Sequence, residues 1–215
     1  MLRYTTELRS VNEGFEMVRK HESTKVRQRQ IVNAARKVII KYGSEHVTVK
    51  RIAKEVGVSE GAIYRHFKSK RDILSLLIDD IENTLLPETE LSSTGGPYTP
   101  ETLEIIIKDH MSHVVQRRGV SFQVIAEIIS LGDKRLNKKV YEVINKYTSR
   151  IRDILAEGLK AGVIRQDIDL EAAATLFFGL MQGLVNTWAL SQYSFNLQEK
   201  YASTWYIFRE AVIKR

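Results

Sequence analysis

The chain contains no cysteine, which excludes disulfide scaffolds, thiolate metal sites and cysteine nucleophiles. The first 25 residues hold no unbroken apolar run, so we expect no signal peptide and a cytoplasmic location. A Gly-rich phosphate loop and a Gly-x-Ser-x-Gly sequence are also missing, and no spacing arranges carboxylates or histidines as an acid and a base. An enzyme is therefore the class of protein that the sequence favours least.

Proline is nearly as scarce, because the 215 residues hold only Pro87, Pro97 and Pro100. All three lie in the stretch PETELSSTGGPYTP, whose serine, threonine and glycine residues do not favour a helix. We expect residues 87–100 to form a flexible loop.

Strand patterns are lacking too, since β-branched residues rarely alternate with polar ones and no Asn-Gly or Asp-Gly hairpin sequence occurs. Apolar residues instead recur every three or four positions, as in Ile31, Ala35, Val38 and Tyr42, which is typical of an amphipathic helix. The pattern predicts an all-α protein. We expect further helices at about 48–57, 59–67, 70–81, 101–114, 121–130, 134–161, 170–191 and 197–214.

Positive charge is concentrated in one part of the chain. Residues 20–72 contain 14 Lys and Arg against 5 Asp and Glu, a net charge of +9, whereas the remainder is nearly balanced. A surface that neutralises the phosphates of a nucleic acid has this composition. Charge alone leaves a solvated basic face as an alternative.

The basic block contains the string TVKRIAKEVGVSEGAIYRHFKSK, which predicts two short helices joined by residues 56–59. Thr48 and Ser59 are suitable N-caps for them, and Gly57 allows a left-handed turn between them. This spacing is that of a helix-turn-helix, whose second helix lies in the major groove of DNA. We expect Ala53, Val56, Val58 and Ile63 to hold the two helices together.

The same block resembles the DNA-binding domain of the TetR family of transcriptional regulators. The resemblance rests on residues 31–35, Gly43, Thr48, Ile52-Ala53, Gly57-Val58-Ser59, residues 62–67, Lys68, Lys70 and Leu74. It implies a three-helix helix-turn-helix domain at residues 23–70 and a ligand-binding and dimerisation domain at residues 71–215. It also implies contacts with the bases of double-stranded DNA from Lys50, Glu60, Gly61, Ala62 and Arg65, and with phosphates from Thr48, Ser59, Tyr64, His66 and Lys70.

The 27 residues from Ala172 to Gln198 carry no charge, and this stretch is long enough to cross a membrane. Gln182, Asn186, Thr187 and Gln192 argue against a membrane span, and a helix buried on both sides explains the composition better. The resemblance implies a homodimer, in which about Glu171–Ser191 and Leu197–Lys214 of the two subunits form a four-helix bundle.

His110 and His113 lie three residues apart and share a helix face, but two imidazoles make an incomplete metal shell, so we predict no metal and no cofactor. The resemblance places these histidines on a helix that bounds the ligand cavity. We expect the cavity to be lined by His110, His113, Gln116, Phe122, Tyr141, Asn145, Phe177, Phe178 and Met181.

These patterns predict a ligand-responsive, sequence-specific DNA-binding regulator. We expect a repressor that a small, largely apolar molecule releases from its operator. A DNA-binding regulator controlled by a protein partner is the alternative.

An N-terminal extension, residues 1–22, precedes the basic block. Its apolar residues Tyr4, Leu8, Val11, Phe15 and Val18 follow a 3.5-residue repeat. This repeat predicts an additional helix from about Thr5 to Lys20, with a frayed tail as the alternative.

Overall fold

A computed structural model describes residues 24–88 and 99–214, and the regular elements in these ranges are all helical. Ile164 and Ile213 form an isolated β-bridge. The fold is therefore all-α, as the sequence predicts. The helix predicted at residues 5–20 lies outside the described residues. The elements are α1 (Thr24–Tyr42), the 3-10 turn η1 (Ser44–His46), α2 (Val49–Val56), α3 (Glu60–Tyr64), α4 (Lys70–Glu88), α5 (Pro100–Gln116), α6 (Val120–Leu131), α7 (Lys134–Lys160), α8 (Leu170–Leu190) and α9 (Leu197–Val212).

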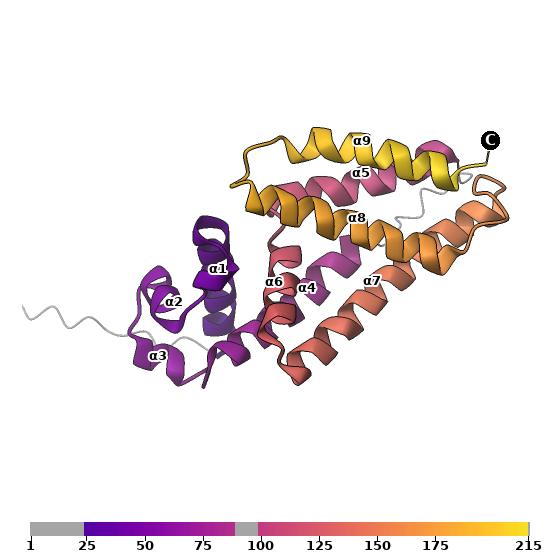
Figure 1. The fold of residues 1–215 in the computed structure, drawn as a ribbon. Helices are drawn as coiled ribbons and strands as arrows, with labels where there is room; N and C mark the ends of the chain where they lie inside the picture. Colours follow the sequence, from indigo (N-terminus) through magenta and orange to yellow (C-terminus); the bar gives the residue numbers. More distant parts are fainter. Residues whose placement is uncertain (1–23, 89–98, 215) are drawn as a thin grey trace, which may run out of the picture.

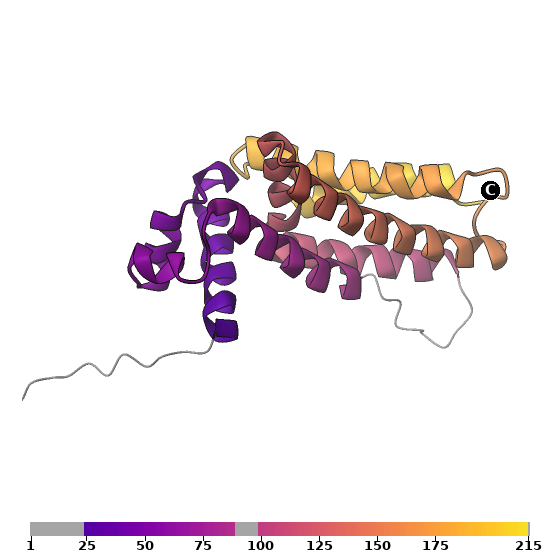
Figure 2. The same ribbon diagram turned by 90° about the horizontal axis from the view of Figure 1, so that it is seen from below.

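The helices form two groups. Figure 1 shows α1, α2 and α3 together at one end of the molecule, whereas α5, α8 and α9 run alongside one another in the larger part and α7 runs obliquely to them. The view in Figure 2 shows α4 leaving the first group and passing beside α7, and α4 contacts both α1 and α7. The predicted domain boundary at residues 70 and 71 therefore falls on the first residues of the helix that joins the two groups.

The caps of the helix-turn-helix are those that the sequence predicts. The Thr48 hydroxyl accepts the Arg51 N–H at 3.2 Å, and the Ser59 hydroxyl accepts the Ala62 N–H at 3.3 Å. Gly57 has a φ of 78°, a left-handed conformation that glycine adopts without steric cost. Local hydrogen bonds thus fix where α2 and α3 begin and where α2 ends.

Three boundaries or faces differ from the prediction. The third helix ends at Tyr64 and not at Phe67, because the chain turns there to bury the Phe67 side chain. Helix α4 continues through Pro87 to Glu88, so the loop predicted at 87 begins later. A proline in the last turn removes the one hydrogen bond that its N–H would make to the carbonyl four residues earlier, and the helix ends one residue later. Tyr42 was predicted on the apolar face of α1, yet it is 45% exposed and its ring lies beneath the Arg51 guanidinium.

The small domain has an apolar core of its own. Ile31, Ala35 and Val38 of α1 are buried, as are Ile52 and Ile63 of the following helices. Val56 and Val58 are partly buried against this core. These are the contacts that the sequence predicts between the helices of the helix-turn-helix.

Helix α7 does not bury every residue that the sequence predicts to lie inside the larger domain. Tyr141, predicted to line the cavity, is 63% exposed, whereas Val140, Val143 and Tyr147 are buried. The long helix begins with the Asp133 carboxylate, which accepts two backbone N–H groups. Its apolar residues recur on two adjacent rows, and the packing of α4 and α8 decides which row is buried.

Helix α8 is the one helix among the described residues whose length and composition would allow it to cross a membrane. Its contacts are those of a core helix, because it packs along α7 and touches α6 and α9. Phe177, Met181 and Trp188 are buried there. Of its most apolar window 33% is buried, so the structure shows burial of one side of this helix, and burial of the second side stays a prediction.

Candidate functional site

The residues predicted to contact DNA bases lie on α3, at the residue after it and on the start of α2. Tyr64 is 52% exposed, and Lys50, Glu60 and Arg65 are also exposed. Gly61 is exposed and Ala62 partly buried, so the first turn of this short helix presents little side-chain bulk. A backbone without bulk can approach base edges closely, while a guanidinium such as that of Arg65 can donate two hydrogen bonds to guanine.

Hydroxyl groups border this surface. Thr48 and Ser59 use an oxygen lone pair to cap a helix, and each hydroxyl keeps its own proton as a donor. His66 is partly buried at the turn after α3. Thr48 and Ser59 can therefore each cap a helix and donate a hydrogen bond to a phosphate at the same time.

Lys70, at the first residue of α4, is engaged in the free protein. Its ammonium lies 2.7 Å from a Glu127 carboxylate oxygen of α6, and the two side chains are 32% and 16% exposed. The Ser44 hydroxyl donates to the other Glu127 oxygen at 3.4 Å. Glu127 therefore links the larger domain to two points of the small domain. Sequence analysis missed it because its partner is 57 residues away.

A second basic feature was also missed. The Arg51 guanidinium lies 4.6 Å from the centre of the Tyr42 ring, and the Lys41 ammonium lies 5.1 Å from it. These cations add to the positive surface beside the N-terminus of α2. In the sequence, only the position of Lys41 and Arg51 within the basic block pointed to this feature.

A buried polar pair lies inside the larger domain. His110 of α5 is 1% exposed, and its Nε2 atom lies 2.8 Å from the Tyr147 hydroxyl of α7. Burial, and to a lesser extent the neighbouring His113, lower the pKa of His110 to about 4, so the ring is neutral at pH 7. Its Nδ1 atom is buried without a hydrogen-bond partner. The Tyr147 ring meets Phe178 edge-on, with 5.9 Å between ring centres.

The structure does not gather the nine predicted cavity residues around one space. Phe178 contacts the rings of Tyr147 and Phe122, and Tyr147 in turn contacts His110. Phe177 and Met181 are buried core residues, with Phe177 packed on Phe208. The other predicted residues lie in three separate places. His113 and Phe122 border a void of about 10 Å³, and Gln116 lines a cavity of about 210 Å³ beside α1 and α4. Tyr141 and Asn145 are exposed on α7. Within the described ranges, no group of three or more His, Asp or Glu could hold a metal ion.

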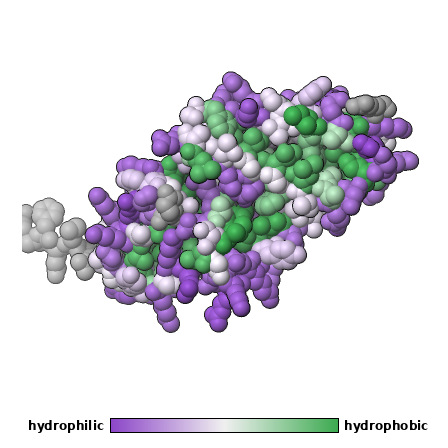
Figure 3. Space-filling model, viewed as in Figure 1, coloured by the Kyte–Doolittle hydropathy of each residue, from purple (hydrophilic) through white to green (hydrophobic). Residues whose placement is uncertain are grey.

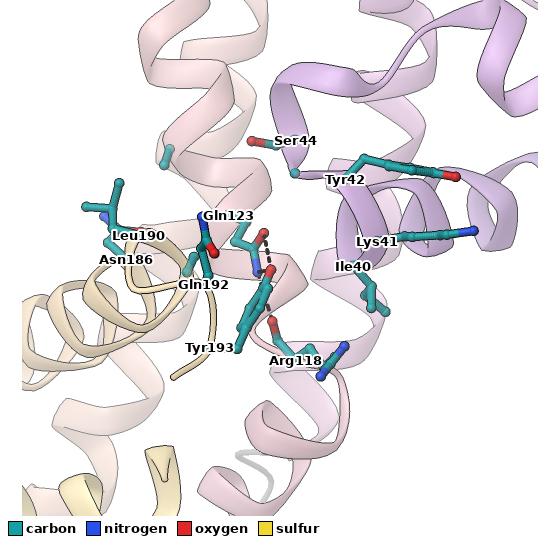
Figure 4. Close-up of a pocket in the computed structure, with 13 residues that line it drawn as sticks. Ile40, Lys41, Tyr42, Ser44, Arg118, Gln123, Asn186, Leu190, Gln192 and Tyr193 are labelled. Carbon is teal, nitrogen blue, oxygen red and sulfur yellow. Dashed lines mark hydrogen bonds between the residues drawn. The ribbon is translucent and has the colours of Figure 1, made fainter. Parts of the chain in front are cut away.

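The largest described cavity, about 870 Å³, opens between the two domains (Figure 4). Another of about 440 Å³ lies between α5 and α9 and includes Met111, Tyr201 and Trp205. Neither contains a residue of the predicted set.

One face of the larger domain is left apolar and open. Leu176, Gly179 and Gly183 of α8 are exposed, and nothing lies within 4 Å of a Cβ atom placed on either glycine. Tyr206 and Ile207 of α9 are 59% and 70% exposed. Figure 3 shows hydrophobic side chains gathered over this part of the molecule.

Both domains match known protein families. Residues 31–77 match the model described as bacterial regulatory proteins, tetR family, and residues 71–210 match the model of the YsiA-like protein C-terminal region. The second match alone covers more than half of the chain.

Individual relatives agree with these matches. The fatty acid metabolism regulator protein of Bacillus subtilis (strain 168) is 29% identical over 168 residues, 78% of this chain and 86% of its own. The nucleoid occlusion factor SlmA of Shewanella sediminis (strain HAW-EB3) is 24% identical over 170 residues, 79% of this chain and 86% of its own. The crystal structure of the regulator FadR from Bacillus subtilis in complex with stearoyl-CoA superimposes with a TM-score of 0.68 at 27% identity, covering 84% of this chain and 96% of that one. The chain therefore belongs to the tetR family of bacterial regulatory proteins and is a DNA-binding regulator of transcription.

Proposed function

We propose that this protein is a homodimeric repressor that leaves its operator when a largely apolar molecule binds its larger domain. The observation that carries the proposal is the exposed helix-turn-helix surface, joined through α4 and Glu127 to a domain with a buried polar pair. A DNA target supports a cytoplasmic location as part of the same proposal. The proposed function includes no catalytic step.

The DNA contacts divide into two kinds. Arg65, Lys50, Glu60 and the small residues Gly61 and Ala62 approach base edges and carry sequence specificity. Phosphates are bound by Thr48, Ser59, Tyr64, His66 and Lys70, which set the register of α3 without reading sequence. The exposure of Tyr64 and Arg65 supports this division.

A homodimer supplies the second recognition helix that a two-fold symmetric operator needs. The exposed apolar residues of α8 and α9, within about 171–191 and 197–214, support these helices as the interface. Glycines at 179 and 183 allow close approach of a partner helix, because no side chain separates the two backbones.

The effector is proposed to be a long acyl chain or a similarly apolar compound. The related FadR from Bacillus subtilis has been crystallised with stearoyl-CoA. Aromatic side chains around the His110–Tyr147 pair offer an apolar wall with one polar point, a combination that orients a ligand with a single polar group. The void of about 10 Å³ bordered by His113 and Phe122 is too small for such a ligand, so binding against Phe122 requires the packed interior to open.

The test begins by selecting an operator from random duplex DNA with the purified dimer. Fluorescence anisotropy then measures the operator dissociation constant with stearoyl-CoA, with coenzyme A alone as the control. We expect stearoyl-CoA to weaken operator binding at least tenfold, about 1.4 kcal/mol of coupling, and operator DNA to weaken stearoyl-CoA binding by the same factor. Saturation with stearoyl-CoA and an unchanged operator affinity would refute this effector class.

A second candidate is DNA binding controlled by a protein partner. Similarity to the nucleoid occlusion factor SlmA supports it, because that name describes a role in the nucleoid and not a response to a metabolite. A thermal-stability screen against metabolite pools separates the two candidates, since only a ligand-responsive protein gains stability from a small molecule.

A further inference from the structure

The cleft between the two domains is built from two turns that face the end of α1. One wall contains the turn before α6, with Arg118, and the turn between α8 and α9, with Gln192 and Tyr193. The opposite wall is residues 40–44. Its volume of about 870 Å³ is that of a site for a small organic molecule.

Backbone strain is concentrated at this cleft. Among the described residues, the non-glycine residues with positive φ are Arg118, Gln192 and Tyr193, at 52°, 54° and 61°, and all three line it. Such conformations are unfavourable for side chains with a Cβ atom and persist where surrounding contacts enforce them, often at ligand sites. Strained non-glycine backbone in the described residues is therefore confined to the two turns that line the cleft.

Hydrogen bonds hold the two strained turns together. The Gln123 side-chain amide donates to the Arg118 carbonyl at 2.9 Å and to the Tyr193 hydroxyl at 3.3 Å. Gln123 is 6% exposed, so it is a buried polar residue of the wall. The Tyr193 N–H donates to the Trp188 carbonyl at 2.8 Å. This network fixes the Arg118 backbone and the Tyr193 side chain, on whose ring the Arg118 guanidinium lies.

The resulting arrangement is electropositive. The Arg118 guanidinium stacks over the Tyr193 ring at 5.1 Å and points across the cleft toward Ile40 (Figure 4). Lys41 and Tyr42 point away from the Tyr193 wall in the same view. No Asp or Glu is among the described residues that line the cleft, and Arg118 has no carboxylate partner among the described residues. A guanidinium without a carboxylate partner favours an anionic ligand.

We propose that the interdomain cleft binds a small organic anion, whose acidic group contacts Arg118 and whose apolar part lies against Ile40 and Ala189. The site is distinct from the buried His110–Tyr147 pair, and its occupant would touch both domains. The cleft is therefore proposed as a second effector site. If the cleft bound no anion, the proposed function would be unaffected.

Trp188 provides the reporter for this site, because its ring lies 4.8 Å from Tyr193 between centres. The chain has two tryptophans, so Trp205→Phe leaves Trp188 as the sole donor of tryptophan fluorescence. The probe is anilinonaphthalene sulfonate, an organic anion that accepts energy from tryptophan. Full-length Trp205→Phe dimer is titrated with it, with and without Arg118→Gln. Arg135→Gln, an exposed arginine of α7, is the matched control.

We expect saturable energy transfer from Trp188 and a dissociation constant that rises at least about tenfold with Arg118→Gln, because a charge-assisted hydrogen bond is lost. Arg135→Gln should leave the constant unchanged. Competition with naphthoate and with naphthyl phosphate identifies whether a carboxylate or a phosphate is preferred. Absence of energy transfer at saturation, equal binding by the Arg118→Gln variant, or equal competition by neutral naphthamide would each overturn the proposal.

Discussion

The ion pair between Glu127 and Lys70 should compete with DNA. A phosphate and the Glu127 carboxylate, 2.7 Å from the Lys70 ammonium, would compete for the same positive charge, and this contact is partly exposed to solvent. A partly exposed pair is worth about 0.2–1 kcal/mol. Breaking it in both subunits of a dimer therefore costs up to about 2 kcal/mol, a factor of about 30 in the dissociation constant.

Glu127→Gln removes the negative charge and keeps an oxygen that can accept from Ser44. We expect it to tighten DNA binding by about 2-fold to 30-fold, as fluorescence anisotropy would measure. Operator and random duplexes should gain equally, because phosphate contacts carry no sequence information. Glu157→Gln is the matched control, since Glu157 also pairs with a lysine on the surface, at the far end of α7.

A double-mutant cycle tests whether the gain passes through Lys70. In a Lys70→Gln background, Glu127→Gln should have no effect beyond that of the Glu157→Gln control. The reasoning fails if Glu127→Gln binds no more tightly than the control, or if its gain persists without Lys70.

Three further predictions concern other parts of the molecule. Arg65→Ala should reduce discrimination between operator and random DNA by about 1–3 kcal/mol in competition assays, because a base contact is lost; equal losses for both DNAs would remove Arg65 from the base-reading set. Gly119→Ala should lower the free energy of unfolding in urea by about 2 kcal/mol or more, since its Cβ would lie 2.4 Å from a Val185 methyl; Gly132→Ala, with similar φ and open space, should cost about 1 kcal/mol. The folded-state pKa of His110, about 4, lies below its ordinary value of 6.5, so its contribution to stability is present above pH 6.5 and is lost as the pH falls toward 4. The wild type should lose up to about 3 kcal/mol more than His110→Phe over that window at fixed protein concentration, and parallel pH profiles would contradict this.

Features encoded within a few residues could be predicted without the structure. The caps at Thr48, Ser59 and Asp169, the left-handed Gly57 and the start of α5 at Pro100 all depend on hydrogen bonds or dihedral angles within about four positions. The helix-turn-helix followed from these signals together with the local excess of positive charge. Among the residues predicted to contact DNA, Lys50, Glu60, Tyr64 and Arg65 are exposed, whereas Ala62 and His66 are partly buried.

The candidate effector residues were harder to place, because an apolar periodicity identifies a helix but not its neighbours. Tyr141 and Tyr147 lie on the same helix, and only the packing of α4, α5 and α8 against α7 leaves the first exposed and buries the second. His110 was identified from its type and spacing, whereas its partner Tyr147 was not.

The sequence by itself therefore determined the all-α class, the helix-turn-helix and the positive DNA-binding surface, since each arises from short-range patterns. Tertiary structure decided the Lys70–Glu127 pair, the His110–Tyr147 pair and the cleft at Arg118. Lys70 and Glu127 are 57 positions apart in the sequence, and His110 and Tyr147 are 37 apart. Arg118 and Tyr193, which line the cleft, are about 75 apart. Contacts at such separations depend on how helices cross, and crossing angles are set by the interlocking of side chains across the whole core.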